Sequence, residues 1–537
     1  MQDRIEPADG AAAANPTAKK LVIFADGTGS AFGQQESNIW RMYQALDKTQ
    51  GPDQPLQIAR YIQGVGTSSI GVLRYFDGAT GLGVPSNVRK LYRFLCLNWR
   101  DGDEIYLFGF SRGAFTVRTL AALVARQGLM PQDVTRAEMD RNAMAAWRAY
   151  RKMTAPLIEG GWLRMNPLIS VVRGLRDGAV AAKRWVLGQR QHAAVTAALP
   201  EARKPGQVPI TFMGVFDTVE AYGLPVDELR SVVNWLIWPI QFRNFRCSPV
   251  VRRVRHALAL DEERRSFYPL RFQQGLRPDG LPEPDLHERW FPGVHSDVGG
   301  GYPNDEIAFE PMLWMVDEVS PDLRFDQAAL GRYRARLYPQ APINDSRDGL
   351  AMLYRYGPRP ILAGPEFGGE PLVDLAAVRK ILEGADGYAP LTLPAAFRVA
   401  AMNKSDQSQP GSLQRDSDAA AVIDRLIGLR RKTNWITIAG LVALVLPLIR
   451  SLYGDCCEAA GSVLSCSISV VTGAVSGAPG VILADWRYYL AVALLLIAVF
   501  WVNARMASKI RDASGRLWRV PPVPQAEGAL QTSGGGQ

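Results

Sequence analysis

The chain of 537 residues is poor in the side chains that cross-link small secreted domains or hold structural metals. It has five cysteines and four histidines, and no two cysteines stand in a CxxC pair. These counts argue against a disulfide framework and a zinc site, and they favour reduced thiols and synthesis in the cytosol. No apolar stretch follows a basic start, so no secretory signal peptide is expected.

Basic residues outnumber acidic ones, and the formal net charge is +9. Such a balance suits nucleic acid or an anionic membrane surface. The sequence has neither zinc-finger spacing nor an aromatic RNA-binding signature, so nucleic acid is not expected as a partner. The composition is 47% hydrophobic, which is ordinary for a globular chain of more than one unit.

Short apolar runs alternate with helical patterns in the first three hundred residues. Residues 21–25, 105–108, 210–216 and 290–294 are predicted strands, and residues 87–99 have the apolar spacing of a helix. Strands that alternate with helices imply a mainly parallel sheet covered on both faces. We therefore expect an α/β fold.

The predicted organisation has five parts. Residues 1–19 are polar and expected to be disordered, and residues 20–402 are expected to form a catalytic domain. Two insertions, at about 131–205 and 225–255, are read either as a cap over a site or as ordinary core packing. A polar linker, 403–432, precedes an apolar region, 433–505, and a tail, 506–537, that is first basic and then disordered.

The apolar region contains two segments, 435–449 and 488–502, that predict a transmembrane helical hairpin. Each is somewhat shorter than the ~20 residues that span a bilayer. Arg430, Arg431 and Lys432 precede the first segment, and Arg505 and Lys509 follow the second. Because cytoplasmic flanks are basic, both ends are expected on the cytoplasmic side. The alternative is a buried helical hairpin in a soluble protein.

The pentad Gly109-Phe-Ser-Arg-Gly113 follows a predicted strand and precedes an apolar helical pattern. A nucleophilic serine in a Gly-x-Ser-x-Gly motif needs this strand-to-helix turn, with small residues on both sides of it. The pentad alone is a modest signal in a chain with 50 glycines, but its setting strengthens it. Ser111 is therefore the predicted nucleophile, and a structural glycine turn is the alternative.

A serine nucleophile needs a base and an acid that orients the base, in the chain order serine, acid, histidine. Asp217 directly follows the predicted strand 210–216, where active residues of parallel sheets lie. The segment Asp217 to Glu220 also fits a helix cap. Asp261 and Asp297 are rivals for the acid.

The predicted base is His295, which follows an apolar run and precedes the glycines at 299–301. Three other histidines suit the role less well. His192 lies in a basic helical insertion, His287 lies in a polar stretch, and His256 is placed at the start of a predicted helix. A loop histidine bonded to Asp297 is the alternative reading of His295.

The turn Asp26-Gly-Thr-Gly29 after the first strand resembles part of a phosphatase signature, but Phe24 stands where that chemistry requires a nucleophilic aspartate. The turn is better interpreted as part of an oxyanion hole. The amide of Arg112 would supply one donor, and an amide near Gly27 or Thr28 would supply the other. A purely structural turn is the alternative.

Five motifs occur in order and carry a family resemblance. They are FADGT from residue 24, YIQGVGT from 61, GDEIYLFGFSRGAFT from 102, GVFDT from 214 and FPGVHSDVGGGY from 291. Over residues 20–320 the chain resembles the α/β-hydrolase family that includes the type VI secretion phospholipase effectors. The resemblance implies a triad that falls on Ser111, Asp217 and His295. It also implies phospholipid hydrolysis, an antibacterial role in some members, and a secretion-system or immunity partner.

Together these observations predict a membrane-associated serine hydrolase that cleaves carboxyl esters, most plausibly phospholipid acyl esters. Such a mechanism needs no metal and no organic cofactor. Two alternatives stay open. One is a soluble esterase that acts on substrates other than lipids, and the other is a non-catalytic membrane module built on a hydrolase scaffold.

Overall fold

The computed structural model describes thirteen main stretches of the chain. They are 18–27, 36–49, 54–64, 83–154, 191–220, 246–275, 283–320, 322–348, 354–384, 387–401, 404–410, 413–457 and 485–519, with residues 174, 178–180, 182, 186, 188 and 351 besides. Residues 1–17, most of the predicted disordered start, lie outside them, as does the end of the tail. The chain divides into two compact units, which are residues 1–377 with 400–407, and 378–399 with 408–537.

One sheet runs in the order β2-β1-β3-β4-β5-β6-β7-β8-β9. Its first seven strands in chain order pair in parallel. The apolar runs of β1, β3 and β4 are buried on both faces, as the centre of a parallel sheet requires. The predicted α/β class is therefore confirmed. The bounds are β1 Lys20–Ala25, β2 Gln57–Ile62, β3 Glu104–Phe110, β4 Ile210–Phe216, β5 Val251–Ala259, β6 Asp285–Phe291, β7 Leu372–Val373, β8 Arg398–Ala401 and β9 Lys404–Pro410.

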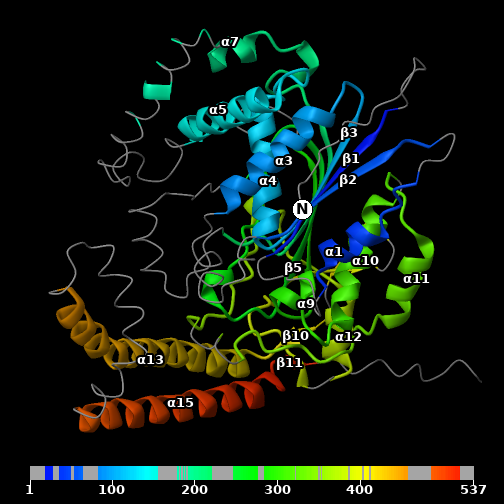
Figure 1. Cartoon of the computed structure of the whole chain (residues 1–537). Helices are drawn as coiled ribbons and strands as arrows, with labels where there is room; N and C mark the ends of the chain where they lie inside the picture. The colour runs from blue at the N-terminus through cyan, green and yellow to red at the C-terminus, as the bar shows by residue number, and fades with distance from the viewer. Residues whose placement is uncertain are drawn as a thin grey trace, which may run out of the picture. The chain divides into compact units, whose positions relative to one another are not determined.

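Helices cover both faces of the sheet in the first unit (Figure 1). Side chains alternate along β1, so Leu21 and Ile23 join one core cluster while Val22 and Phe24 join the other. The first cluster includes α3 Val84–Asn98, α4 Arg112–Gln127 and α5 Arg136–Thr154, and the second includes α1 Asn38–Ala45, α10 Phe309–Val319 and α11 Gln327–Arg336. Shorter helices are α7 His192–Ala197, α9 His295–Gly299, α12 Leu375–Leu382, η3 Glu201–Arg203, η4 Arg265–Phe267, η5 Glu306–Ala308 and η7 Pro365–Phe367.

The largest correction to the sequence prediction concerns β5. His256 was placed at the start of a helix, but it lies inside this strand. The strand is hard to recognise because it carries a buried arginine, Arg255, whose guanidinium pairs with Glu318 and Asp285. β5 also begins inside the predicted insertion 225–255, and residues 221–245 of that insertion lie outside the described ones.

Two segments near the domain boundary differ from the prediction. The predicted linker 403–432 contains β9, β10 (Gln414–Arg415) and the start of α13 (Ser417–Cys457). The Asp416 carboxylate accepts hydrogen bonds from the amides of Asp418 and Ala419, so the polar stretch caps a helix. The predicted tail begins inside α15 (Trp486–Ser514), which is followed by β11 (Trp518–Arg519), antiparallel to β10.

In the second unit, α13 and α15 pack side by side in opposite directions. Thr433 Oγ1 donates a hydrogen bond to Asn503 Oδ1 at 2.6 Å, and Tyr488 OH donates one to the Ala443 carbonyl at 2.6 Å. The earlier residue of α13, Thr433, contacts the later residue of α15, Asn503, and the later residue of α13, Ala443, contacts the earlier residue of α15, Tyr488. The two helices are therefore antiparallel. The basic residues before 433 and after 503 therefore lie at the same end of this helix pair.

Among the described residues, α15 is the one helix long and apolar enough to cross a membrane, with a mean hydropathy of 2.1 over its best window. Only 22% of that window is buried. Its exposed side chains include Leu494, Ile497 and Trp501. The other predicted segment, 435–449, lies partly outside the described side chains. Length and composition alone make α15 a candidate span and nothing more.

Candidate active site

Ser111 stands at a sharp turn between β3 and α4. Its φ of 57° and ψ of −122° lie outside the regions that side chains ordinarily allow. The two flanking residues must be glycines because there is no room for a Cβ atom at either position. A Cβ at Gly113 would lie 2.0 Å from the Ala25 carbonyl oxygen, and one at Gly109 would lie 2.6 Å from Ala114 Cα. The pentad therefore forms the strained elbow that its sequence setting predicts.

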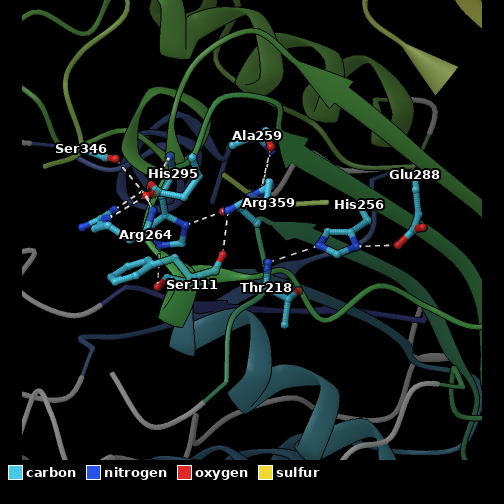
Figure 2. Close-up of polar contacts among 12 residues, drawn as sticks. Ser111, Thr218, His256, Ala259, Arg264, Glu288, His295, Ser346 and Arg359 are labelled. Carbon is cyan, nitrogen blue, oxygen red and sulfur yellow. Dashed lines mark hydrogen bonds and ion pairs between the residues drawn. The ribbon is translucent and has the colours of Figure 1, made fainter. Parts of the chain in front are cut away.

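Three predicted side chains come together at the ends of β3, β4 and β6 (Figure 2). His295 Nε2 lies 2.8 Å from Ser111 Oγ, and His295 Nδ1 lies 2.5 Å from Asp217 Oδ2. Asp217 follows β4 with a positive φ of 37°, and His295 begins α9 just after β6. The three groups, of which Ser111 and His295 are 184 residues apart and Asp217 and His295 are 78 apart, form one buried series of hydrogen bonds.

The rival acids lie close to this site but contact the backbone of the loop before His295. Asp261 Oδ2 accepts a hydrogen bond from the Gly293 amide at 2.7 Å. Asp297 Oδ2 accepts one from the Val294 amide at 2.9 Å, and Asp297 Oδ1 accepts one from Asn344 Nδ2 at 2.6 Å. Burial raises the pKa of Asp297 to about 6, against the effect of these bonds. Both residues hold the loop, and neither carboxylate has a hydrogen bond to His295 in the described structure.

Asp217 shares its carboxylate with an arginine that sequence reasoning missed. Arg359 Nη1 donates to Asp217 Oδ1 at 2.6 Å, and Nη2 donates to Oδ2 at 3.0 Å. The Ala259 amide also donates to Oδ1, at 3.1 Å. Burial alone would raise the pKa of Asp217, but the Arg359 charge and the hydrogen bond to His295 outweigh it and hold that pKa well below its usual range. Asp217 is therefore ionised, and its contacts differ from those of a helix cap.

Glu262 holds the backbone of His295. Its carboxylate accepts hydrogen bonds from the His295 amide at 3.2 Å and from Ser346 Oγ at 2.9 Å. Arg264 donates to both of its oxygens at 2.8 Å. Burial would raise the pKa of Glu262, but the Arg264 charge outweighs this and keeps the pKa below its ordinary value. The backbone that presents His295 is thus held by a fully buried carboxylate, which the partly buried Arg264 neutralises.

The His295 imidazole lies between two aromatic rings. Its centroid is 4.8 Å from that of Phe110 and 5.0 Å from that of Phe267, which meets it edge-on. Burial lowers the pKa of His295 below its ordinary value, and Asp217 only partly opposes the shift. A neutral imidazole whose Nδ1–H donates to Asp217 leaves Nε2 free to accept the proton of Ser111.

A second histidine–acid pair lies behind the site. His256 Nδ1 is 2.9 Å from Glu288 Oε1, and the Thr218 amide donates to His256 Nε2 at 3.2 Å. Glu288 also accepts a hydrogen bond from Arg271 Nε at 2.8 Å. Since Thr218 directly follows Asp217, His256 fixes the backbone next to the acid (Figure 2). The remaining histidines lie apart, His192 beside Gln127 and His287 beside Asp285.

The predicted oxyanion donors are only partly described. Gly27 lies beside the nucleophile, since a Cβ there would be 3.4 Å from Ser111 Cβ. Its amide donates to Asp26 Oδ1 at 2.6 Å, so in this structure that N–H is engaged. Thr28 lies outside the described residues. The Arg112 amide, at the first position of α4, has no hydrogen-bond partner within the described part of the chain.

The described residues contain no group of three histidine, cysteine or acidic side chains placed to hold a metal ion. Of the groups that build the site, Arg359, Glu262 and Asp26 were missed from sequence. Asp26 accepts hydrogen bonds from Ser37 Oγ and Tyr61 OH, which ties the first turn to its neighbours. The sequence signal for Asp26 was its position directly after a predicted strand. Arg359 lies in the segment YGPRP, which matches no motif.

The fold and the site define an α/β protein with a serine elbow and a histidine–aspartate pair within hydrogen-bonding distance. The family model described as the type VI secretion system phospholipase effector, Tle1-like, catalytic domain matches residues 19–318. That is more than half of the 537 residues. The chain therefore belongs to this family of phospholipase effectors, and the resemblance of its five motifs is confirmed.

Two further likenesses are more distant. An uncharacterized protein of Saccharomyces cerevisiae is 27% identical over 274 residues, which cover 47% of this chain and 33% of that protein. The chain thus spans about a third of the length of this curated relative. The crystal structure of an uncharacterized protein from Pseudomonas aeruginosa is similar over 63% of this chain and 50% of that one, with 17% identity and a TM-score of 0.32.

Proposed function

We propose that this chain is a membrane-associated serine hydrolase of the α/β-hydrolase type that cleaves phospholipid acyl esters. The observation that carries the proposal is the continuous series of hydrogen bonds from Ser111 through His295 to Asp217. The strained elbow at Ser111 and the lowered pKa of His295 support it. Membership in a family of phospholipase effectors supports phospholipid as the substrate.

In the proposed reaction, His295 Nε2 takes the proton of Ser111 Oγ as the oxygen attacks the acyl carbonyl carbon. Asp217 stabilises the imidazolium that forms. The carbonyl oxygen becomes an oxyanion that accepts a hydrogen bond from the Arg112 amide and one from a second donor near the first turn. Each such donor contributes about 2.7–4 kcal/mol of transition-state stabilisation.

The tetrahedral intermediate collapses when the ester C–O bond breaks and His295 returns its proton to the leaving alcohol. The alcohol is the lysophospholipid, and the acyl group stays on Ser111. Water, deprotonated by the same imidazole, then attacks the acyl-enzyme and releases a fatty acid. Every proton passes through His295, so the proposed reaction needs no cofactor.

The exposed apolar side of α15 supports insertion into lipid, since only 22% of its most apolar window is buried inside the protein. The proposal includes α13 as the second helix of a membrane hairpin. Arg430 to Lys432 and Arg505 to Lys509 lie at one end of the helix pair, which supports an arrangement with both ends on the cytoplasmic side. Arg505 lies over the Trp501 ring at 3.9 Å, a pairing suited to a membrane interface.

Family membership further supports a role as a type VI secretion effector, with an immunity protein as a natural partner. A housekeeping lipase with the same site would hydrolyse the same lipids. Expression inside a bacterium without a matching immunity protein separates the two, because an antibacterial effector arrests growth and its Ser111→Ala variant does not.

The decisive experiment compares wild-type protein with Ser111→Ala on vesicles of phosphatidylethanolamine and phosphatidylglycerol, with lipid products measured by mass spectrometry. We expect wild type to release fatty acid and lysophospholipid, and we expect a fluorophosphonate probe to label Ser111. Release by the Ser111→Ala protein, or absence of labelling, would overturn the serine mechanism.

The same assay tests the two alternatives. Turnover of a short soluble ester without vesicle turnover, from a protein that carbonate washes off membranes, would identify a soluble esterase. Vesicle binding with no turnover of any ester would identify a non-catalytic membrane module.

A further inference from the structure

The residue directly after the nucleophile carries a positive charge without a partner. Arg112 is the first residue of α4, next to Ser111. Its Nη1 atom is buried and has no hydrogen bond, and in the described structure its guanidinium has neither an acidic partner nor a ring stacked on it. Burial lowers its pKa to about 10, so the group remains charged at neutral pH.

Other guanidinium groups of the first unit have hydrogen-bond acceptors. Arg359 pairs with Asp217 and Arg264 pairs with Glu262, whereas Arg203 donates to backbone carbonyls. A buried N–H without an acceptor is costly, so the Nη1 group of Arg112 calls for a ligand that accepts hydrogen bonds. Arg112 differs from these three arginines in lacking an acceptor, and it is the one next to the nucleophile.

Arg112 follows Ser111 directly at the start of α4, so its side chain is attached one residue from the nucleophile. A bound ester would present its leaving alcohol at this turn.

We propose that the Arg112 guanidinium binds the phosphate of the substrate, so that the site selects esters whose alcohol carries a phosphate group. This inference rests on the proposed phospholipase function and adds the group that recognises the headgroup. In a glycerophospholipid only a few bonds separate each ester carbonyl from the phosphate. A planar guanidinium matches phosphate oxygens with paired N–H donors, which a compact ammonium does not.

The test compares two soluble substrates with the same acyl chains, dihexanoylphosphatidylcholine and uncharged dihexanoylglycerol. For Arg112→Met we expect the ratio of kcat/KM on the phospholipid to kcat/KM on the glyceride to fall about 10- to 100-fold, the usual effect of a lost charged hydrogen bond. Arg112→Lys should recover part of the loss. Arg126→Met, on the exposed end of the same helix, is the control and should leave both rates unchanged.

Equal losses on both substrates, or no loss on either, would overturn the inference. Wild-type turnover of the glyceride but not of the phospholipid would instead overturn the proposed function. A second measurement does not depend on turnover: glycerol 3-phosphate should protect Ser111 from a fluorophosphonate in wild type but not in Arg112→Met. Protection by inorganic phosphate alone, with unchanged phospholipid kinetics, would identify a free-anion site and reject the headgroup role.

A second inference comes from a different observation, the contact between Arg359 and Asp217. Both side chains are fully buried, and Arg359 also donates hydrogen bonds to the Ala259 and Phe267 carbonyls. The Arg359 guanidinium therefore has a fixed position, and it donates a hydrogen bond to each oxygen of the Asp217 carboxylate. Arg359 lies outside residues 19–318, the part of the chain that the family model matches.

We infer that Arg359 is a positioning residue for the proposed triad. It orients the Asp217 carboxylate toward His295 Nδ1 and allows a fully enclosed carboxylate to stay ionised. Like the first inference, this one rests on the proposed serine mechanism. If Arg359 has this role, the site depends on a residue that lies outside residues 19–318, the part matched by the family model.

A positioning role predicts a change in the pH profile as well as in rate. Without the Arg359 charge, both Asp217 and His295 hold protons more tightly, so the acid limb of kcat/KM on a soluble ester moves to higher pH. We expect Arg359→Met to lose about 100-fold or more at the wild-type optimum and Arg359→Lys to recover part of it. Arg203→Met is the matched control, since Arg203 is a buried arginine that donates to carbonyls remote from the site.

A double-mutant cycle separates positioning from general damage to the fold. In an Asp217→Asn background, Arg359→Met should change kcat/KM by less than about threefold, because its target is already lost. Additive losses would overturn the inference, and so would an unshifted acid limb in Arg359→Met. Arg359→Lys retains the charge, so its acid limb should move less than that of Arg359→Met. If wild type shows no serine-dependent turnover at all, the proposed function fails instead.

Discussion

The two units differ in where their charged and apolar side chains lie. In the first unit, charged groups lie inside the protein, where Asp217, Glu262 and Glu288 each meet an arginine. In the second unit, large apolar side chains such as Leu494 and Ile497 lie outside, with 56% and 63% of their surface exposed. The first arrangement suits electrostatic work in a water-poor site, and the second suits contact with lipid.

This contrast teaches that one protein can have two low-dielectric environments of different origin. At the site, the folded chain itself excludes water, whereas α15 has an apolar surface that nothing within the described unit covers. Changes to the paired charges around Asp217 should therefore affect turnover on any ester, and changes to α15 should affect turnover only on membranes. The following predictions test that separation.

The largest effect is expected from Asp217→Asn. Removing the negative charge leaves His295 without its orienting partner, and comparable changes in serine hydrolases cost about 10⁴-fold in kcat. The loss should be the same on a soluble ester and on vesicles, measured by fatty acid release. Circular dichroism serves as the folding control, and a loss confined to vesicles would contradict the assignment of this residue to chemistry.

The next effect is expected from placing charge on α15. Leu494→Asp combined with Ile497→Asp should weaken binding to anionic vesicles by about 100-fold or more, since a charged residue inside a bilayer costs about 2.5–3.5 kcal/mol. Flotation with liposomes measures the binding. Turnover of a soluble ester should not change, and Gln327→Asp on the exposed face of α11 is the control. Unchanged flotation would assign membrane contact to another surface.

A smaller effect, on stability, is expected from His256→Leu. The change leaves the Thr218 amide without its acceptor and removes one partner of Glu288, at a cost of about 3 kcal/mol in the free energy of unfolding. Urea unfolding measures the loss, and His192→Gln should cost less than about 1 kcal/mol. A neutral result at position 256 would mean that Arg271 and the Phe272 amide suffice to hold Glu288.

The smallest effect concerns pH. Activity requires neutral His295, and burial lowers its pKa below the ordinary value of about 6.5. The acid limb of kcat/KM on a soluble ester should therefore lie below that value, and activity should be lost only as pH falls further. Rates measured from about pH 4 to about pH 9 test this. A limb above the ordinary value would mean that Asp217 outweighs burial.

Local signals in the sequence were enough for much of the fold and for the core of the site. The strand 210–216 was predicted with the bounds that the structure has, because its apolar run ends at an aspartate. Ser111, Asp217 and His295 were predicted because each sits at a strand end, and the structure brings them within hydrogen-bonding distance. Their catalytic roles remain a proposal.

What the sequence could not supply depends on partners far away in the chain. Arg359 meets Asp217 across 142 residues, and nothing near Arg359 distinguishes it from a surface arginine. β5 was misread for a related reason, since Arg255 looks exposed until Glu318 neutralises it. Buried charges contradict the rule that charge lies outside, so pattern reasoning fails where such pairs occur.

The two residues with positive φ have a consequence for the history of the chain. Among the described non-glycine residues, Ser111 and Asp217 are the ones in this conformation, which costs about 1–3 kcal/mol each. Glycine would relieve the strain at either position, so Ser111→Gly should unfold at a higher temperature than wild type while losing the proposed activity. At position 111, selection for stability alone would favour glycine, whereas at position 217 the buried pair with Arg359 offsets the strain. The serine at position 111 is thus a record of selection for something other than stability.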